Sequence, residues 1–243
     1  TLEASSAASD VYKRQGNLRW KTPEPAESWN GLLQANEFKD ECFQREIIFA
    51  EEKFIGSEDC LYLNIWSPRL SEQEINEMDK PLPVMMWIHG GGNIVGDAKI
   101  YDPSTLVSEQ EVIVVTIQYR MGALGWFRHP SLVDQNSSLE EKSGNFGTLD
   151  TIAALKWIKR NIDAFGGDPN NVTIFGESAG GHNVTALFAS PLAAGLFHKV
   201  IVQSGVSSVS SIKASESYLP ENREAPTDLS LIHISEPTRR ILI

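Results

Sequence analysis

The chain has 243 residues, of which 41% are hydrophobic and 22% charged, and it contains six tryptophans. This composition excludes a disordered or fibrous protein and allows one large domain, or two small ones, with a substantial core. The formal net charge of -11 argues against nucleic acids and anionic membrane surfaces as partners. No apolar run reaches the roughly 18 residues that a membrane span requires.

Five short apolar segments predict β-strands: residues 61–66, 83–89, 112–119, 171–175 and 199–203. The third is apolar nearly throughout, which is typical of a strand buried on both faces. Longer segments between them predict helices, one within 148–167 that stops at Gly166-Gly167 and one over 179–190, after Ser178, that is ended by Pro191. This alternation predicts an α/β fold with a largely parallel, doubly wound sheet, whose site lies at the carboxyl ends of the strands.

The segment TIFGESAGG, residues 173–181, places Ser178 in the frame G-x-S-x-G between a strand and a helix. Glycines at 176 and 180 remove side chains that would collide in a sharp strand-to-helix turn, and such a turn exposes the serine hydroxyl. The positive end of the following helix favours negative charge there. We therefore expect Ser178 to be a nucleophile rather than a structural serine.

The run His89-Gly90-Gly91-Gly92 follows the second predicted strand. Bare backbone amides in such a run can point at one oxygen atom, as an oxyanion hole requires. A flexible glycine turn is the alternative, but the serine turn downstream favours the oxyanion hole. The spacing of these glycines does not match a phosphate-binding loop.

A serine nucleophile requires a histidine base and an acid, and the five histidines are poor candidates for that base. They are His89, His129, His182, His198 and His233. His89 opens the glycine run, where it is expected to brace backbone, and His182 follows the serine on the same helix. In hydrolases of this topology the order is Ser, acid, His, so both partners are expected after Ser178 and beyond this chain.

Cys42 and Cys60 are the two cysteines. Their spacing and number fit either two unrelated reduced thiols or one local disulfide closing a surface loop. A disulfide would indicate an oxidising compartment.

The two ends do not follow the alternating pattern. Residues 1–15 lack the apolar centre of a signal peptide, and DVYKRQ near the start and LSLIHISEPTRRILI at the end resemble translated sequencing-adapter read-through. We expect residues 1–15 and 229–243 to be non-native and residues 16–228 to be the N-terminal part of one domain. Genuine disordered tails are the alternative.

Several long segments together resemble the type-B carboxylesterase family, which includes carboxylesterases and cholinesterases. They are residues 29–44, 57–68, 101–107, 144–167, 165–181 and 190–205. The resemblance runs from about residue 16 to residue 206. It implies an α/β-hydrolase fold that is truncated here after the nucleophile helix and the strand that follows it.

Carried over residue by residue, the resemblance implies Ser178 as nucleophile and the amides of Gly91, Gly92 and Ala179 as the oxyanion hole. The supporting residues would be Glu177 beside the serine, Ser204, which matches a position that hydrogen-bonds the triad acid, and His89. Cys42 and Cys60 match the family's first disulfide. No metal or organic cofactor is implied.

One residue and one loop depart from the family pattern. Asn93 stands where an aromatic often follows the glycines, which leaves the wall of the acyl pocket undefined. The Cys42–Cys60 loop contains no Trp, which argues against choline esters, because cholinesterases hold the quaternary ammonium there by a cation–π contact.

The sequence therefore predicts a serine carboxylesterase that acts on small-molecule carboxylic esters through an acyl-enzyme and is secreted or periplasmic. The chain as given, without acid and histidine, is expected to be inactive alone. A non-catalytic, esterase-like adhesion or binding domain is the alternative, although such relatives usually lose the nucleophile that is intact here.

Overall fold

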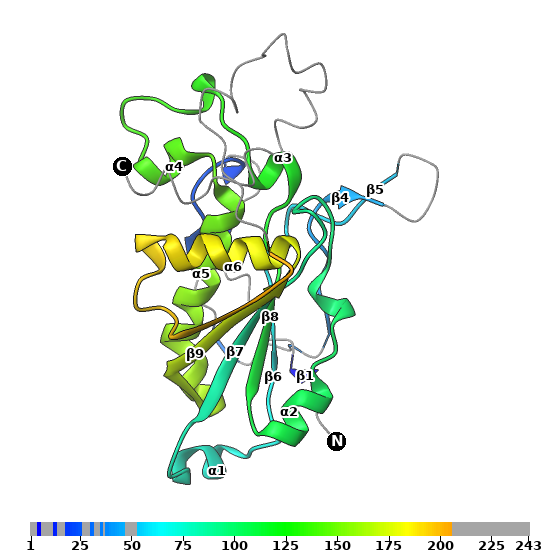
Figure 1. Cartoon of the computed structure of the whole chain (residues 1–243), viewed down its shortest axis with the longest axis vertical. Helices are drawn as coiled ribbons and strands as arrows, with labels where there is room; N and C mark the ends of the chain where they lie inside the picture. Colours follow the sequence, from blue (N-terminus) through cyan, green and yellow to red (C-terminus); the bar gives the residue numbers. More distant parts are fainter. Residues whose placement is uncertain are drawn as a thin grey trace.

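The computed structural model describes residues 4–5, 12–13, 18–25, 30–31, 35, 37–46 and 53–205 (Figure 1). The predicted non-native segment 229–243 and His233 lie outside the described residues, as does most of 1–15. The division of the chain at residues 15 and 228 therefore stays a prediction.

A six-stranded sheet with the order β1-β6-β8-β7-β9-β10 forms the centre of the described chain. Its strands are β1 (Ala4–Ser5), β6 (Leu63–Trp66), β8 (Ile113–Ile117), β7 (Leu82–Ile88), β9 (Gly167–Glu177) and β10 (Lys199–Gln203). The pairs β8–β7, β7–β9 and β9–β10 are parallel, whereas β6 runs antiparallel to β8 and β1 antiparallel to β6. The predicted mostly parallel sheet is thus confirmed.

Each of the five predicted strands is present, but one of them begins earlier than its sequence indicates. β10 has the predicted bounds 199–203, while β9 begins at Gly167 instead of residue 171. Its first residues, Gly167-Asp-Pro-Asn-Asn, have the composition of a turn, yet Gly167 pairs with Leu82 across a register irregularity. Pairing with β7 overrides the local turn preference.

Helices cover both faces of the sheet (Figure 1). The α-helices are α1 (Glu72–Glu77), α2 (Ser104–Gln110), α3 (Gly122–Gly125), α4 (Leu139–Ser143), α5 (Phe146–Asn161) and α6 (Ala179–Ala189). Short 3-10 helices are η2 (Ala98–Ile100), η3 (Pro130–Leu132), η4 (Ile162–Phe165) and η5 (Pro191–Ala193). The predicted helix within 148–167 is therefore α5 followed by η4, and it stops at Gly166, which caps η4 with a φ of 81°.

Alternating residues of β8 divide the core into two layers. Ile113 and Ile117 belong to a large cluster with residues of α5 and α6, whereas Val114 packs with Val107 of α2 on the opposite face. All five residues of β8 are buried, as predicted for a strand covered on both sides. The sheet is doubly wound, because α2 lies on one face and α5 and α6 lie on the other.

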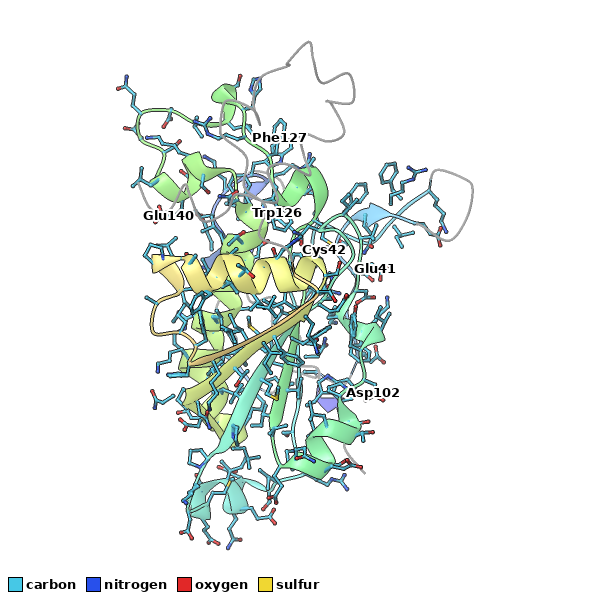
Figure 2. The ribbon with its side chains drawn as sticks, viewed as in Figure 1. Glu41, Cys42, Asp102, Trp126, Phe127 and Glu140 are labelled. Carbon is cyan, nitrogen blue, oxygen red and sulfur yellow. A yellow bond between two sulfur atoms is a disulfide. The ribbon has the colours of Figure 1, made fainter. Side chains whose placement is uncertain are left out.

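Two small hairpins precede β6 in the chain, and the segment that follows β8 forms much of the structure beyond the carboxyl ends of the parallel strands. The hairpins are β2 (Tyr12–Lys13) with β3 (Glu24–Pro25), and β4 (Gln44–Arg45) with β5 (Phe54–Ile55). Figure 2 shows Trp126, Phe127 and Glu140 in this region, with Asp102 on the other side near α2. Among the described helices, none combines the length and apolarity needed to cross a membrane.

Candidate active site

Ser178 lies between β9 and α6, at the carboxyl end of a parallel strand and the N-terminus of an 11-residue helix. Its φ of 55° and ψ of -119° lie in a region that residues with side chains rarely adopt. The turn is fixed on both sides, because Ser178 N donates to Gln203 O at 2.9 Å and Ser178 O accepts from His182 N at 3.0 Å. Such strain, of about 1–3 kcal/mol, persists where the surroundings hold it and is concentrated at functional sites.

Two glycines near the serine turn leave no room for a side chain. A Cβ at Gly180 would lie 2.0 Å from the Ile88 carbonyl oxygen. A Cβ at Gly90 would lie 2.9 Å from the Glu177 carbonyl oxygen and 3.3 Å from the Ser178 Cβ. The glycine loop after β7 and the serine turn are therefore in direct contact.

The backbone N–H groups of Gly91, Gly92 and Ala179 are among those in this region that make no hydrogen bond to another described residue. Gly91 and Gly92 adopt φ values of 102° and 65°, and Ala179 is the first residue of α6, where the N–H has no partner within the helix. Unpaired amides at a helix N-terminus and in a glycine loop are suited to an anionic oxygen.

His89 lies beneath the glycine loop, fully buried. Its Nδ1 is 2.9 Å from the Gly90 carbonyl oxygen, and its ring stacks on Tyr119 at 4.4 Å between centroids. The Tyr119 hydroxyl donates to the His89 carbonyl oxygen at 2.7 Å. Burial lowers the pKa of His89, and the Gly90 carbonyl, Asp97 and Gln118 oppose that effect. The ring is thus enclosed beneath the loop and contacts it at Gly90.

The other candidate residues are more open. His182 is half-buried on α6, His129 and His198 are exposed, and Glu177 and Ser204 are exposed at the ends of β9 and β10. Burial lowers the pKa of His182. Within the described part of the chain, no hydrogen bond joins the Ser178 hydroxyl to a histidine, and no group of three or more His, Cys, Asp or Glu side chains is arranged to hold a metal ion.

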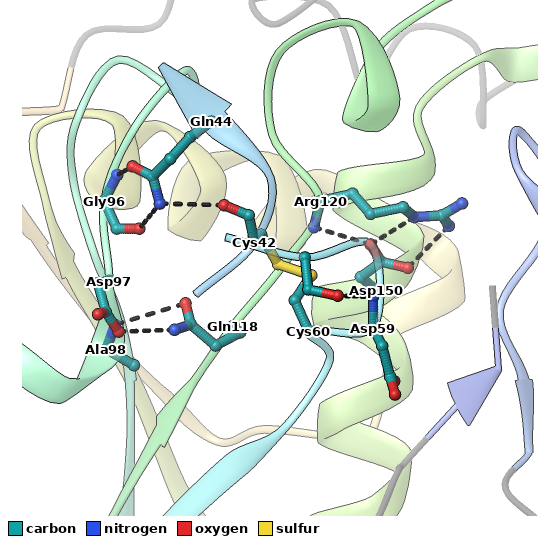
Figure 3. The surroundings of a disulfide bond; sticks show 11 residues. Cys42, Gln44, Asp59, Cys60, Gly96, Asp97, Ala98, Gln118, Arg120 and Asp150 are labelled. Carbon is teal, nitrogen blue, oxygen red and sulfur yellow. Dashed lines mark hydrogen bonds and ion pairs between the residues drawn. A yellow bond between two sulfur atoms is a disulfide. The ribbon is translucent and has the colours of Figure 1, made fainter. Parts of the chain in front are cut away.

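Cys42 and Cys60 form the disulfide that the family resemblance implies (Figure 3). Gln44, two residues after Cys42, connects the disulfide loop to Gly96, which follows the glycine loop. The Gln44 side-chain nitrogen donates to Gly96 O at 2.9 Å, and its side-chain oxygen accepts from Gly96 N at 2.7 Å. Gln44 is buried, and its pair of hydrogen bonds with Gly96 was not predicted from the sequence.

Asn93 and Asn183 are a second contact that the sequence did not reveal. Asn183 Nδ2 donates to Asn93 Oδ1 at 2.8 Å, and both residues are buried. An amide side chain in a mostly apolar helix was the available signal, because a buried amide requires a partner. The sequence does not indicate that this partner lies 90 residues away.

A profile of the carboxylesterase family matches residues 14–226. The chain belongs to this family. Among curated members, the cocaine esterase of Homo sapiens is 44% identical over 211 residues, covering 82% of this chain and 35% of the human protein. Liver carboxylesterase 1 of Oryctolagus cuniculus is 44% identical over 208 residues, covering 81% of this chain and 34% of that protein.

Solved esterase structures share the fold of this family member. A PNB esterase is 41% identical, with a TM-score of 0.73 over 86% of this chain and 41% of that chain. A carboxylesterase of Geobacillus stearothermophilus is 33% identical, with a TM-score of 0.72 over 94% and 48% of the two chains. The fold is that of the α/β-hydrolases, and the chain spans about a third of the length of the curated relatives it matches.

Proposed function

We propose that this chain carries the nucleophile and oxyanion hole of a serine-dependent carboxylic ester hydrolase. The observation that carries the proposal is the conformation of Ser178, which sits at a strained strand-to-helix turn against the glycine loop. Membership of the carboxylesterase family supports the same reaction. The substrate class is a small-molecule carboxylic ester.

In the proposed reaction the Ser178 hydroxyl oxygen attacks the ester carbonyl carbon while a base takes its proton. The carbonyl oxygen becomes negatively charged, and the N–H groups of Gly91, Gly92 and Ala179 stabilise it. The intermediate collapses, the alcohol leaves with the proton from the base, and an acyl-enzyme remains. Water then attacks the acyl carbon by the same route, releases the acid and regenerates Ser178.

The base and the acid are proposed to lie after β10 in the longer protein, in the order acid and then histidine. Two findings support this placement: no described histidine is bonded to the Ser178 hydroxyl, and the matched relatives are about three times longer than the aligned segment. Ser204, directly after β10, is proposed to bond the acid.

An oxidising compartment, secreted or periplasmic, is proposed from the Cys42–Cys60 disulfide. Disulfides persist in such compartments and are rare where thiols are kept reduced.

The test uses the protein encoded by the complete reading frame that contains this chain, with p-nitrophenyl acetate as substrate. S178A is expected to lower kcat by at least about a thousandfold, since triad members act as a unit. The matched control is S108A, which removes an exposed serine hydroxyl on α2 that bonds Thr105 O and should leave kcat unchanged. Equal rates for S178A and the unmutated protein would overturn the proposal and favour a non-catalytic binding domain.

A further inference from the structure

Two buried asparagines join the glycine loop to the helix that follows Ser178. Asn93 is 0% exposed and Asn183 is 1% exposed. Each side-chain amide donates to the oxygen of the other, at 2.8 Å from Asn183 Nδ2 and at 3.4 Å from Asn93 Nδ2. The pair is a reciprocal amide contact between the two segments that meet at the candidate site.

On the loop side, the backbone around Asn93 is held in one conformation. Asn93 has a φ of 57°, a left-handed value that Asn tolerates better than most residues. Its carbonyl oxygen accepts from Gly122 N at 2.6 Å, and Ile94 N and Val95 N both donate to Gly91 O at 3.1 Å. Movement of the Asn93 side chain is therefore coupled to the turn that contains Gly91.

On the helix side, Asn183 lies one turn beyond Ala179 on the same face of α6, because residues four apart are neighbours on a helix. Ala179 carries one candidate oxyanion-hole N–H group, and the loop that includes Asn93 carries those of Gly91 and Gly92. The asparagine pair thus connects the two segments that supply the candidate oxyanion-hole amides, the glycine loop and the N-terminus of α6.

We propose that the Asn93–Asn183 pair is a positioning device, which sets the distance between the Gly91 and Gly92 amides and the Ala179 amide. This inference rests on the proposed esterase function. A reciprocal pair of buried amides tolerates little displacement, because an amide that loses its partner there remains unsatisfied. Oxyanion donors act only when they are held close to hydrogen-bond distance from the developing charge. The pair acts through the backbone and does not touch the substrate.

The kinetic test compares N93A, N183A and N93A/N183A in the complete protein. Each single variant should lower kcat about 10- to 100-fold and change KM less than about twofold. Oxyanion donors stabilise charge that develops only in the transition state, so their displacement affects kcat rather than substrate binding. The double variant should be no slower than the worse single variant, since the contact is already lost.

The matched control is N64A, which removes another buried amide. Asn64 Nδ2 of β6 donates to Thr116 Oγ1 of β8 at 3.0 Å, within the sheet. N64A should lower the unfolding midpoint as N183A does and leave kcat within about twofold. An N183A protein that keeps the kcat of the unmutated protein would overturn the proposal, as would a loss of kcat in N64A equal to that in N183A.

Amide hydrogen exchange separates this proposal from the esterase function. In N183A the amides of Ile94, Val95 and Gly122 should exchange at least about tenfold faster than in N64A, whether or not the protein hydrolyses esters. If the unmutated protein shows no Ser178-dependent hydrolysis, the proposed function fails, and faster exchange alone still supports positioning of the loop. Unchanged exchange in N183A overturns the positioning role even in an active enzyme.

Discussion

Ser178 adopts a backbone conformation that is costly for any residue with a side chain, and its neighbours supply the contacts that hold it there. The Gln203 carbonyl fixes its amide, and Gly180 allows α6 to approach the Ile88 carbonyl. The sequence predicts this turn because the glycines flank the serine in a local pattern. The conformation is thus encoded locally and held by packing against β7 and β10.

Gly90 is the residue at which a single methyl group is expected to disturb the site most directly. In G90A the added Cβ would press on the Glu177 carbonyl oxygen and the Ser178 Cβ. A displacement near 1 Å costs about a hundredfold in rate, so we expect kcat of the complete protein to fall by about that factor. G195A is the control: it strains a left-handed φ of 76° in open space and should leave kcat unchanged. A G90A protein with unchanged kcat at saturating substrate would contradict the contact.

The buried His89 predicts an acid-sensitive stability. Its pKa is lowered in the folded state, so the unfolded chain binds a proton more readily below its ordinary pKa of about 6.5. The contribution of His89 to the free energy of unfolding should therefore be fully present above that pH. The free energy of unfolding should decrease as the pH falls below it. The free energy of unfolding is measured with urea at about pH 7.5 and about pH 5.5. The difference between these two free energies should be smaller for H89Q than for the unmutated protein.

His182 provides the comparison for this pH effect, because burial lowers its pKa as well but it is only half-buried. H182Q should reduce the difference in the free energy of unfolding between the two pH values less than H89Q does. The same pH dependence in H89Q and the unmutated protein would contradict the assignment to His89.

The long-range contacts of the site could not be predicted from one sequence. Asn93 was visible only as a departure from a family pattern, and Gln44 carried no signal at all. Both contacts join residues far apart in the chain through hydrogen bonds, with Asn183 and with Gly96. Local periodicity contains no information on such pairs, whereas the serine turn and the glycine loop are each contiguous.

At the scale of elements, the strands and main helices followed from apolar runs and helical spacing. The errors lie where pairing overrides local preference, as in the first residues of β9, and where a helix tightens, as in η4 after Asn161. The disulfide required the family resemblance, since the cysteine spacing alone left free thiols open.

A buried ion pair joins Arg120, in the segment after β8, to Asp150 of α5. Asp150 accepts from Arg120 Nε at 2.8 Å, from Arg120 NH2 at 2.8 Å and from the Arg120 backbone N at 3.0 Å (Figure 3). D150A leaves the arginine charge buried, so we expect a loss of about 3–5 kcal/mol in the free energy of unfolding, measured by denaturant titration.

The double variant R120M/D150L distinguishes a charge effect from lost packing. It removes both charges and should recover part of the stability that D150A loses, because no unpaired charge remains. A double variant that is less stable than D150A would contradict this explanation.

At the scale of the whole molecule, the sheet ends at β10 within the described residues. Val200, Ile201 and Val202 are 36%, 42% and 44% exposed, which is unusual for an apolar parallel strand. An exposed apolar edge strand pairs readily with another chain. We therefore expect the 243-residue chain to self-associate through β10.

Light scattering after size-exclusion chromatography tests this edge. I201K should reduce self-association, because a lysine at an edge opposes strand pairing. I100K is the matched control, since Ile100 is 69% exposed on η2, outside the sheet. Equal self-association of I201K and I100K would show that the chain associates through another surface.

Covalent labelling of Ser178 distinguishes an ester-hydrolase nucleophile from a structural serine. The complete protein is treated with a fluorophosphonate, which reacts with activated serines, and its peptides are analysed by mass spectrometry. We expect one adduct, on the peptide containing Ser178, and none on S178A. A folded protein that gives no adduct, or an adduct on another serine, would contradict it.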